Sequence, residues 1–341
     1  MFVALIVLTP EVISSRMTLF FRFSIKVRWC LVLLLAISGL RPVICQAQSN
    51  ADTALVAPAP PLLRHSALPA DTARISHRLP ILAGGLALSY TGLVYGLSKS
   101  WYTGERTAFH WFDDSREWKQ LDKAGHFWGA FHESRGAVDM LRWAGVPDRK
   151  ALWYGGFVGF LLQSPLELLD GRDPAYGASA YDLGANFLGS AGLIAQQLAW
   201  NEVRIMPKYS FRTTRYAALR PNVLGKSVGE QHLKDYNGHT YWLCADVAAW
   251  LPQESKWPKW LQPAVGYGAQ QMVYNDPATN AILGLNDYRQ YYLSFDVNLM
   301  RIPTRSKFLK RVFYVASIFH LPAPALEYNS RRGFVLHGLY Y

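Results

Sequence analysis

Charged side chains and cysteines are both scarce in this sequence. Asp, Glu, Lys and Arg together make 17% of the 341 residues, whereas a soluble domain usually has about a quarter. Hydrophobic residues make 50% of the chain and aromatic residues 14%. Two of the three cysteines, Cys30 and Cys45, lie near the N-terminus. Cys244 is then left alone, so the sequence predicts neither an intramolecular disulfide nor a thiolate metal cluster. The scarcity of charge beside many aromatic residues favours contact with lipid.

Motifs of several common functional classes are also missing. The chain has no Gly-x-Ser-x-Gly turn, no phosphate-binding loop and no paired Cys/His finger. Its net charge of +11 nevertheless favours an anionic neighbour. Because no nucleic-acid motif accompanies this charge, we predict that the neighbour is the anionic headgroups of membrane lipids rather than a nucleic acid.

The N-terminus has the pattern of an export signal. Basic residues precede an apolar run at 29–40, and small residues follow at the spacing that a signal peptidase accepts. We predict a signal peptide over residues 1–47 and a Pro- and Ala-rich linker over 48–78. Lipid attachment at Cys45 is an alternative, although the preceding PVI lacks the small residue of a lipobox. The protein is expected in the cell envelope, with the inner membrane favoured and the outer membrane as the alternative.

The middle of the chain is predicted to be a membrane-associated helical core over residues 79–202, with about four helices. Its first helix, at 79–98, is uncharged for twenty residues, which is long enough to cross a bilayer. The fourth helix starts at Ser179 with the capping box SAYD, in which Asp182 reaches back to the helix start. Its uncharged stretch, 183–201, is the second candidate span. The second and third helices are predicted over about 115–144 and 148–169.

Residues 203–341 are predicted to contain a basic segment and then an antiparallel β region. From about Thr240 the hydrophobic period approaches two, and β-branched and aromatic residues are frequent. The expected fold class is therefore α+β. Five predicted strands are fewer than the roughly eight that a single-chain membrane barrel needs. The strands are predicted within 240–250, 264–274, 288–299, 312–320 and 334–341.

Ionisable residues recur at helical spacing in successive predicted helices. Positions i, i+4, i+7 and i+11 share one face of a helix, and Asp122, His126 and Glu133 fall on that spacing. Charged groups on an apolar helix normally face the interior of a bundle and pair there. We therefore predict that these stripes converge into one polar cluster. Its members are predicted to be Asp122, Lys123, His126, Glu133, Glu167, Asp170, Arg172, Asp182 and Asn186.

Two hypotheses account for such a cluster. In the first, Lys123 or Arg172 balances the carboxylates in a buried network, and the protein is a non-enzymatic structural or binding component of the envelope. In the second, the cluster holds a divalent metal ion, or His126 and a carboxylate form an acid–base pair. The protein would then be a hydrolase or transferase for envelope lipid or glycan. The candidate metal ligands are Asp122, His126, Glu167, Asp170 and Asp182.

The segments LDKAGHFWGAF, SPLELLDGRDP and SAYDLGANFLGSAG resemble the YfiM-like predicted periplasmic lipoproteins, a family defined by a domain of unknown function. A fainter similarity runs to VanZ-like membrane proteins. The resemblance covers residues 119–200 and implies an envelope location and an all-helical core, but no activity. The chain departs from the family in its poor lipobox and in its long C-terminal region. The matching positions are Asp122, Lys123, His126, Phe127, Glu167, Asp170, Arg172, Ser179, Asp182, Asn186 and Gly189.

Overall fold

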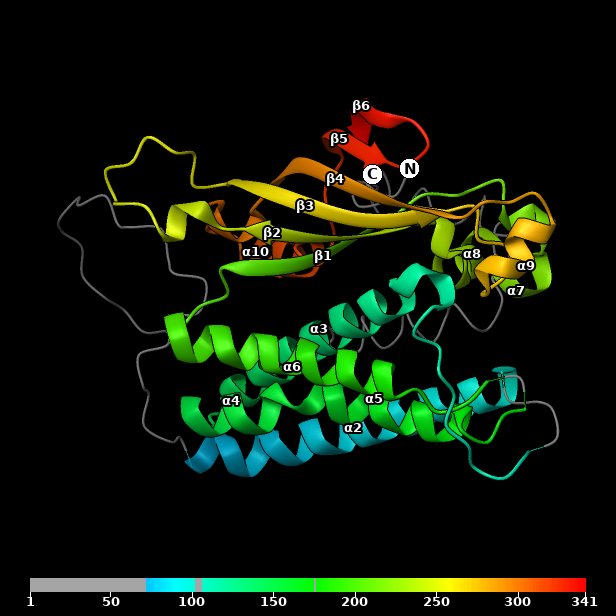
Figure 1. The fold of residues 1–341 in the computed structure, drawn as a ribbon. Coiled ribbons are helices and arrows are strands. Elements are labelled where there is room, and N and C mark those ends of the chain that lie inside the picture. The colour runs from blue at the N-terminus through cyan, green and yellow to red at the C-terminus, as the bar shows by residue number, and fades with distance from the viewer. Residues whose placement is uncertain (1–71, 102–105, 175) are drawn as a thin grey trace, which may run out of the picture.

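The chain folds into a layer of helices and a curled antiparallel sheet (Figure 1). The computed structural model describes residues 72–101, 106–174 and 176–341. The predicted signal peptide, Cys45 and most of the predicted linker lie outside the described residues. Helices and strands are both present in quantity, so the α+β class is confirmed.

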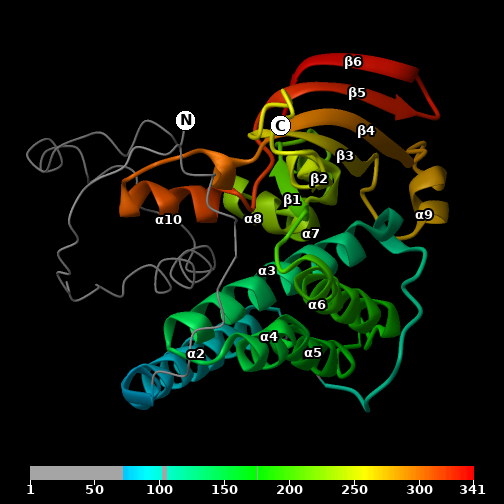
Figure 2. The same ribbon diagram turned by 90° about the vertical axis from the view of Figure 1, so that its left-hand side faces the viewer.

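Helices α2 to α6 form the layer below the sheet, with α3 nearest to the sheet and α2 far from it (Figures 1 and 2). Helix α2 begins at Thr72, so the end of the predicted linker is helical. The predicted third helix is broken at Phe157, which separates α4 from α5. The bounds are α2 Thr72–Trp101, α3 Leu121–Trp143, α4 Asp148–Gly156, α5 Val158–Asp170 and α6 Ala180–Trp200.

Glycines let α4 and α5 lie directly against α3. A Cβ atom at Gly155 would stand 2.6 Å from the backbone nitrogen of Val138, and one at Gly159 would overlap the carbonyl oxygen of Ala130. The small residues of the segment GGFVG, residues 155–159, therefore allow close contact between these helices. The hydrophobic core of this layer consists of Phe131, Val138, Leu152, Leu193, Ile194, Val203 and Met206.

One helix among the described residues is long and apolar enough to cross a membrane, over His77–Gly96 in α2. None of this stretch is buried in the molecule, and Leu88 is 79% exposed. The second predicted span, 183–201, does not pass the same test of length and hydropathy. It belongs to α6, which buries Asn186 and Leu193 inside the bundle. The membrane association of α2 stays a prediction at this point.

Six strands pair in chain order to form the sheet. Four predicted strands are confirmed close to their expected positions, as β2, β3, β4 and β6. Two further strands, β1 and β5, are not predicted, and β1 lies in the basic segment. The bounds are β1 Ile205–Phe211, β2 His239–Ala245, β3 Leu261–Gln270, β4 Tyr288–Val297, β5 Ala323–Asn329 and β6 Gly333–Tyr340.

The strand predicted at 312–320 is wrong, because helix α10, Lys307–Ala316, occupies most of it. The side chain of Ser306 caps this helix by accepting a hydrogen bond from the Leu309 N–H at 3.3 Å. The apolar residues of KFLKRVFYVA fall at helical spacing and give the helix one apolar face. The β-branched residues that suggested a strand are therefore accommodated in an amphipathic helix.

The sheet is strongly curled, and its concave side buries many polar side chains beside an apolar cluster of Trp242, Cys244, Ala264, Tyr292, Ala325 and Tyr340. Lys208 on β1 forms an ion pair with Asp296 on β4 at 2.7 Å. Thr240 on β2 and Tyr340 on β6 are joined by a hydrogen bond of 2.9 Å. Because these strands are not neighbours in the sheet, both contacts cross the concave side. Its buried polar side chains include Lys208, Ser210, Thr240, Gln290, Ser294, Asp296, Glu327 and Asn329.

Replacing Gly159 with alanine is expected to destabilise the protein. The new Cβ would overlap the Ala130 carbonyl oxygen and push α5 away from α3, and overpacking of this kind costs about 1–3 kcal/mol. The matched control is Gly136→Ala in α3, where nothing lies within 4 Å of an added Cβ. Alanine there is favoured over glycine by about 1 kcal/mol. Denaturant unfolding in detergent should place Gly159→Ala below the wild type and Gly136→Ala at or above it. Equal midpoints for the two variants would contradict the close approach.

Candidate functional site

The predicted polar stripes converge where α3, α5 and α6 meet near the start of α3. The helical spacing on each element brings its polar side chains to this one place, as the sequence predicts. Helix α3 contributes Asp122, Lys123 and His126, α5 contributes Glu167, and α6 contributes Asp182 and Asn186.

The ammonium group of Lys123 is the centre of one half of the cluster. It lies 2.8 Å from Asp122 Oδ2 and 3.2 Å from Asp182 Oδ1, and it also forms a short ion pair with Asp114. Burial alone would lower the pKa of this ammonium group, but the charges of Asp122 and Asp182 and its hydrogen bonds outweigh burial and raise the pKa. Lys123 is therefore a permanent cation that holds three carboxylates from three parts of the chain.

Ser179 joins the start of α6 to both neighbours. Its hydroxyl accepts a hydrogen bond from the Asp182 N–H at 3.0 Å, as the capping box predicts, and donates one to Asp114 Oδ1 at 2.7 Å. The other half of the predicted box differs. The Ser179 N–H donates to Glu167 Oε2 on α5 at 3.1 Å, and the side chain of Asp182 faces Lys123 and His126 instead.

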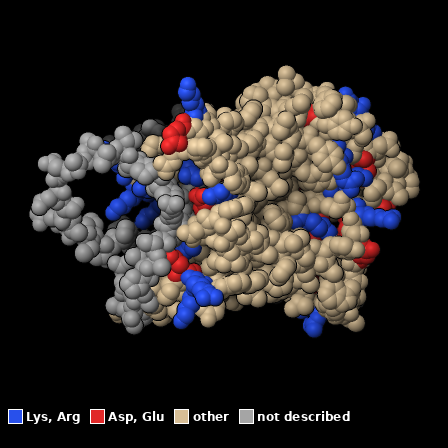
Figure 3. Space-filling view, turned by 60° about the vertical axis from the view of Figure 1, so that its left-hand side comes forward, with Lys and Arg blue, Asp and Glu red and all other residues tan. Residues whose placement is uncertain are grey.

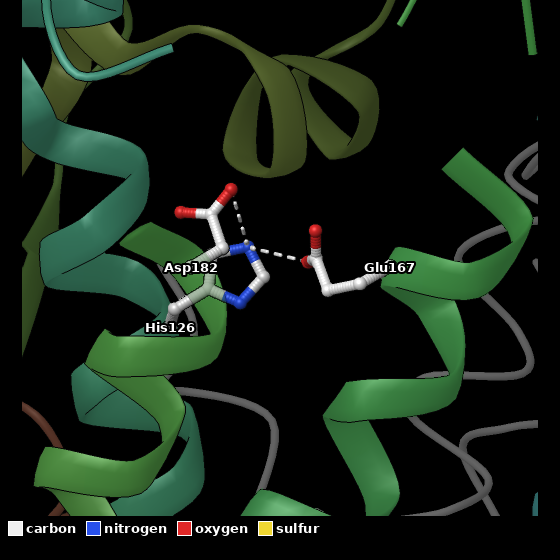
Figure 4. A group of neighbouring side chains, drawn as sticks. All are labelled: His126, Glu167 and Asp182. Carbon is white, nitrogen blue, oxygen red and sulfur yellow. Dashed lines mark ion pairs between the residues drawn. The ribbon is translucent and has the colours of Figure 1, made fainter. Parts of the chain in front are cut away.

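His126 is the centre of the other half of the cluster. Its Nδ1 lies 3.0 Å from Asn186 Oδ1 and 3.2 Å from Gln163 Oε1, so a protonated Nδ1 donates to these amide oxygens. Its Nε2 faces Glu167 Oε1 and Asp182 Oδ2, each at 3.9 Å (Figure 4). A distance of 3.9 Å is too long for a hydrogen bond. The imidazole nitrogen and the two carboxylate oxygens thus converge, but no hydrogen bond joins the nitrogen directly to either oxygen.

The acidic groups beside His126 titrate near neutral pH. Burial raises the pKa of Glu167 to about 7 and that of Asp182 to about 6, although the charge of His126 opposes both shifts. Burial would lower the pKa of His126, but the charges of Asp182 and Glu167 outweigh it and raise that pKa. Perturbed groups in one place are typical of functional sites and also of structural ion-pair networks.

Two sets of side chains in the described part of the chain have donor atoms spaced for a metal ion. They are His126, Glu167 and Asp182, and Asp114, Asp122 and Asp182. Within each set the donor atoms all lie within 4.8 Å of one another. Lys123 already pairs with every member of the second set, so the first set is the better candidate. One imidazole and two carboxylates suit Zn, Mn or Fe(II).

The remaining predicted members lie at the edge of the cluster. Arg172 is exposed, and its backbone carbonyl accepts a hydrogen bond from the Thr107 N–H at 3.0 Å. The cation that pairs with the carboxylates is therefore Lys123 rather than Arg172. Asp170 helps to raise the pKa of Glu167 but belongs to neither donor set. Glu133 is exposed and is joined to the cluster through Gln163, whose Nε2 donates to it at 3.1 Å.

Asp114 is a cluster member that the sequence does not identify. It lies before α3, where no helical spacing relates it to the stripes, and it is 7% exposed. The available signal was the pair Asp113–Asp114 in the aromatic segment AFHWFDD, an unusual place for two acids in a chain with few charges.

Comparison with protein-family models, with curated proteins and with solved structures found no match for this chain. The YfiM-like and VanZ-like resemblances stay predictions that rest on the motif residues.

Glu167 is expected to contribute more stability at pH 5 than at pH 8 when a chelator is present. A carboxyl group with a raised folded pKa stabilises the fold fully below its unfolded pKa, and this contribution is lost as the pH rises through the folded pKa. For Glu167 that window ends at about pH 7, and the raised pKa of His126 acts in the same direction.

Glu167→Gln should flatten this pH dependence by about 3 kcal/mol between pH 5 and pH 8. The amide fills the same volume but does not titrate. Denaturant unfolding at several pH values measures the effect, and Glu254→Gln at an exposed position is the control. A Glu167→Gln variant whose stability changes with pH as much as that of the wild type would show that Glu167 does not titrate in this way.

Proposed function

We propose that this chain is a non-enzymatic structural or binding component of the cell envelope, attached to a membrane through α2. The polar cluster serves to hold the helical layer in one arrangement. The observation that carries this proposal is the set of ion pairs around Lys123, because it joins the segment before α3, α3 itself and α6.

The bonds around Lys123 continue without a break into the rest of the cluster. Asp114 accepts from Ser179, and the Ser179 N–H donates to Glu167 on α5. His126 reaches Asn186 on α6 and Gln163 on α5. Each helix is thus tied to the other two by polar contacts. Removal of one partner from such a network leaves a buried charge without compensation, which costs about 3–5 kcal/mol.

The attachment to a membrane is supported by α2 and its surroundings. The stretch His77–Gly96 is apolar and has none of its residues buried. Near its start, the Arg78 guanidinium lies 4.4 Å from the ring centre of Trp143 and donates to the Trp143 carbonyl at 2.7 Å. An arginine and a tryptophan at the end of an apolar helix are typical of a membrane interface. Farther along, the Tyr90 hydroxyl donates to the Leu162 carbonyl on α5 at 2.7 Å and ties α2 to the layer.

The charge and the N-terminal pattern support the location. A net charge of +11 suits anionic headgroups, and a cleaved signal over residues 1–47 would deliver the chain to the envelope.

Lys123→Met is expected to prevent stable folding, because three carboxylates would lose their buried cation and the loss is about 3–5 kcal/mol. The control is Lys150→Met on α4, an exposed position that should behave as the wild type. Purified variants are compared by circular dichroism and by thermal unfolding in the same detergent. A folded Lys123→Met variant with an unchanged unfolding midpoint would contradict a structural role for the cluster.

A metal-dependent hydrolase or transferase for envelope lipid or glycan is the second candidate. The observation that favours it is the convergence of His126 Nε2, Glu167 Oε1 and Asp182 Oδ2 at 3.9 Å separations. A divalent ion bound by these atoms would take the place of the proton that the raised pKa values of Glu167 and Asp182 indicate. It would activate a water molecule for hydrolysis.

The metal hypothesis predicts about one equivalent of a divalent first-row metal in protein purified without chelator. His126→Ala should remove the metal and leave a folded protein, and His77→Ala in α2 is the control that should keep it. Elemental analysis and circular dichroism of the three proteins decide between the candidates. A metal-free wild type together with an unfolded His126→Ala variant would exclude the metal centre and support the structural network.

A further inference from the structure

The sheet exposes apolar side chains on its convex side, whereas its concave side buries polar side chains together with an apolar cluster of Trp242, Cys244, Ala264, Tyr292, Ala325 and Tyr340. On β4, Leu293 is 57% exposed on the convex side, whereas the next residue, Ser294, is 3% exposed on the concave side. On β6, Leu336 is 78% exposed. The side of a water-soluble antiparallel sheet that faces water normally carries polar residues. The convex side therefore suits an apolar environment rather than water.

The strand register arranges the convex side chains in rows, because paired residues on antiparallel strands point to the same side. An aliphatic row crosses the sheet. Its side chains are exposed, except for that of Pro207 on β1, which is buried. An aromatic row lies beside it, shielded at its β1 end and exposed at its β6 end. The aliphatic row is Pro207, Leu243, Val265, Leu293, Leu326 and Leu336. The aromatic row is Tyr209, Tyr241, Tyr267, Tyr291, Tyr328 and Phe334.

Basic residues lie beyond the apolar rows at both ends of the strands. Arg289 and Arg332 are exposed past the aromatic row. At the opposite end, Trp260 is 48% exposed and directly follows the exposed Lys259. The eight residues from Trp260, just before β3, to Tyr267 span about 23 Å at the rise of an extended strand. The apolar band of membrane-embedded strands is about 25 Å tall and is flanked by aromatic residues at both interfaces.

We infer that the convex side of the sheet faces the hydrocarbon of a bilayer with anionic headgroups. This inference rests on the proposed membrane attachment and extends it from α2 to the sheet. The aliphatic row contacts acyl chains, the aromatic residues lie at the two interfaces, and the arginines and lysines reach the phosphate groups. Figure 3 shows a band of surface with few charged side chains crossing the molecule, and Lys, Arg, Asp and Glu gather on either side of it.

An apolar groove of about 550 Å³ opens on the same side of the sheet. Its walls are formed by Phe127 and Trp128 on α3 and by Leu243, Val265 and Tyr291 on the sheet. The groove is continuous with the aliphatic row, because Leu243 and Val265 belong to both. Acyl chains of the surrounding lipid would fill it, and this explains why α3 does not close completely over β3 and β4.

Nitroxide labels at single introduced cysteines test the inference in the full chain. The labels are placed at Leu293 and Leu336 on the convex side, at Leu88 on α2 and at Ser330 in the exposed turn between β5 and β6. The protein is reconstituted into vesicles of phosphatidylcholine and phosphatidylglycerol. Cys30 and Cys45 are replaced by serine, and Cys244 is buried and left in place. The collision rates of each label with oxygen and with a water-soluble nickel chelate are measured, after circular dichroism confirms that each variant is folded.

The inference predicts that the oxygen-to-nickel ratio is several-fold higher at Leu293 and Leu336 than at Ser330. Equal ratios at all three positions would overturn it, since the convex side would then face water. Labels shielded from both reagents would also overturn it. They would indicate a second copy of the chain where dipolar coupling between labels is seen, and the chain's own N-terminal residues where it is not. A high oxygen-to-nickel ratio at Leu88 with a low ratio at Leu293 would contradict the inference but support the attachment through α2. A low ratio at Leu88 as well would remove the attachment itself.

Discussion

The buried charge of Lys123 is the constraint on which the helical layer depends. An ammonium group away from water must be surrounded by anions, and the chain supplies them from Asp114, Asp122 and Asp182. Asp114 can reach it only if the segment before α3 lies across the start of α6, where Ser179 holds it. The same ion pairing directs the carboxylate of Asp182 toward Lys123 rather than back toward the start of α6. One cation therefore fixes a loop, a helix cap and the positions of α3 and α6.

Both the helical layer and the sheet bury polar side chains and expose large apolar ones. In the helical layer the ionisable side chains gather between helices, while Leu88 and other apolar residues are exposed. In the sheet the polar side chains meet on the concave side, where Lys208 pairs with Asp296, and the aliphatic row lies outside. A chain with 17% charged residues is therefore not simply short of charge. Several of its charged side chains are buried in ion pairs, and many large apolar side chains are exposed.

Local periodicity predicted the parts of the structure that depend on neighbouring residues. Helical spacing placed Asp122, His126, Glu167, Asp182 and Asn186 in one cluster, and Ser179 was found by its capping pattern. Contacts between distant segments could not be predicted in this way. Asp114 joins the cluster through the path of a loop, and β1 was hidden because its lysine, Lys208, points inward to an aspartate on β4. The misassigned strand at 312–320 shows the converse, since β-branched residues took a helical form once Ser306 capped them and one apolar face could pack.

Helix α3 connects the polar cluster to the sheet, so the two features are mechanically linked. Between the cluster residues Lys123 and His126, Gly125 has no side chain, and an added Cβ there would stand 2.8 Å from the Tyr241 hydroxyl on β2. Two turns farther on, His132 donates to the Pro207 carbonyl of β1 at 2.7 Å. Along α3, residues that belong to the cluster thus alternate within a few positions with residues that contact the sheet. The ion pairs that fix the rotation of α3 about its axis also fix the sheet, and they set which side of the sheet is left facing outward.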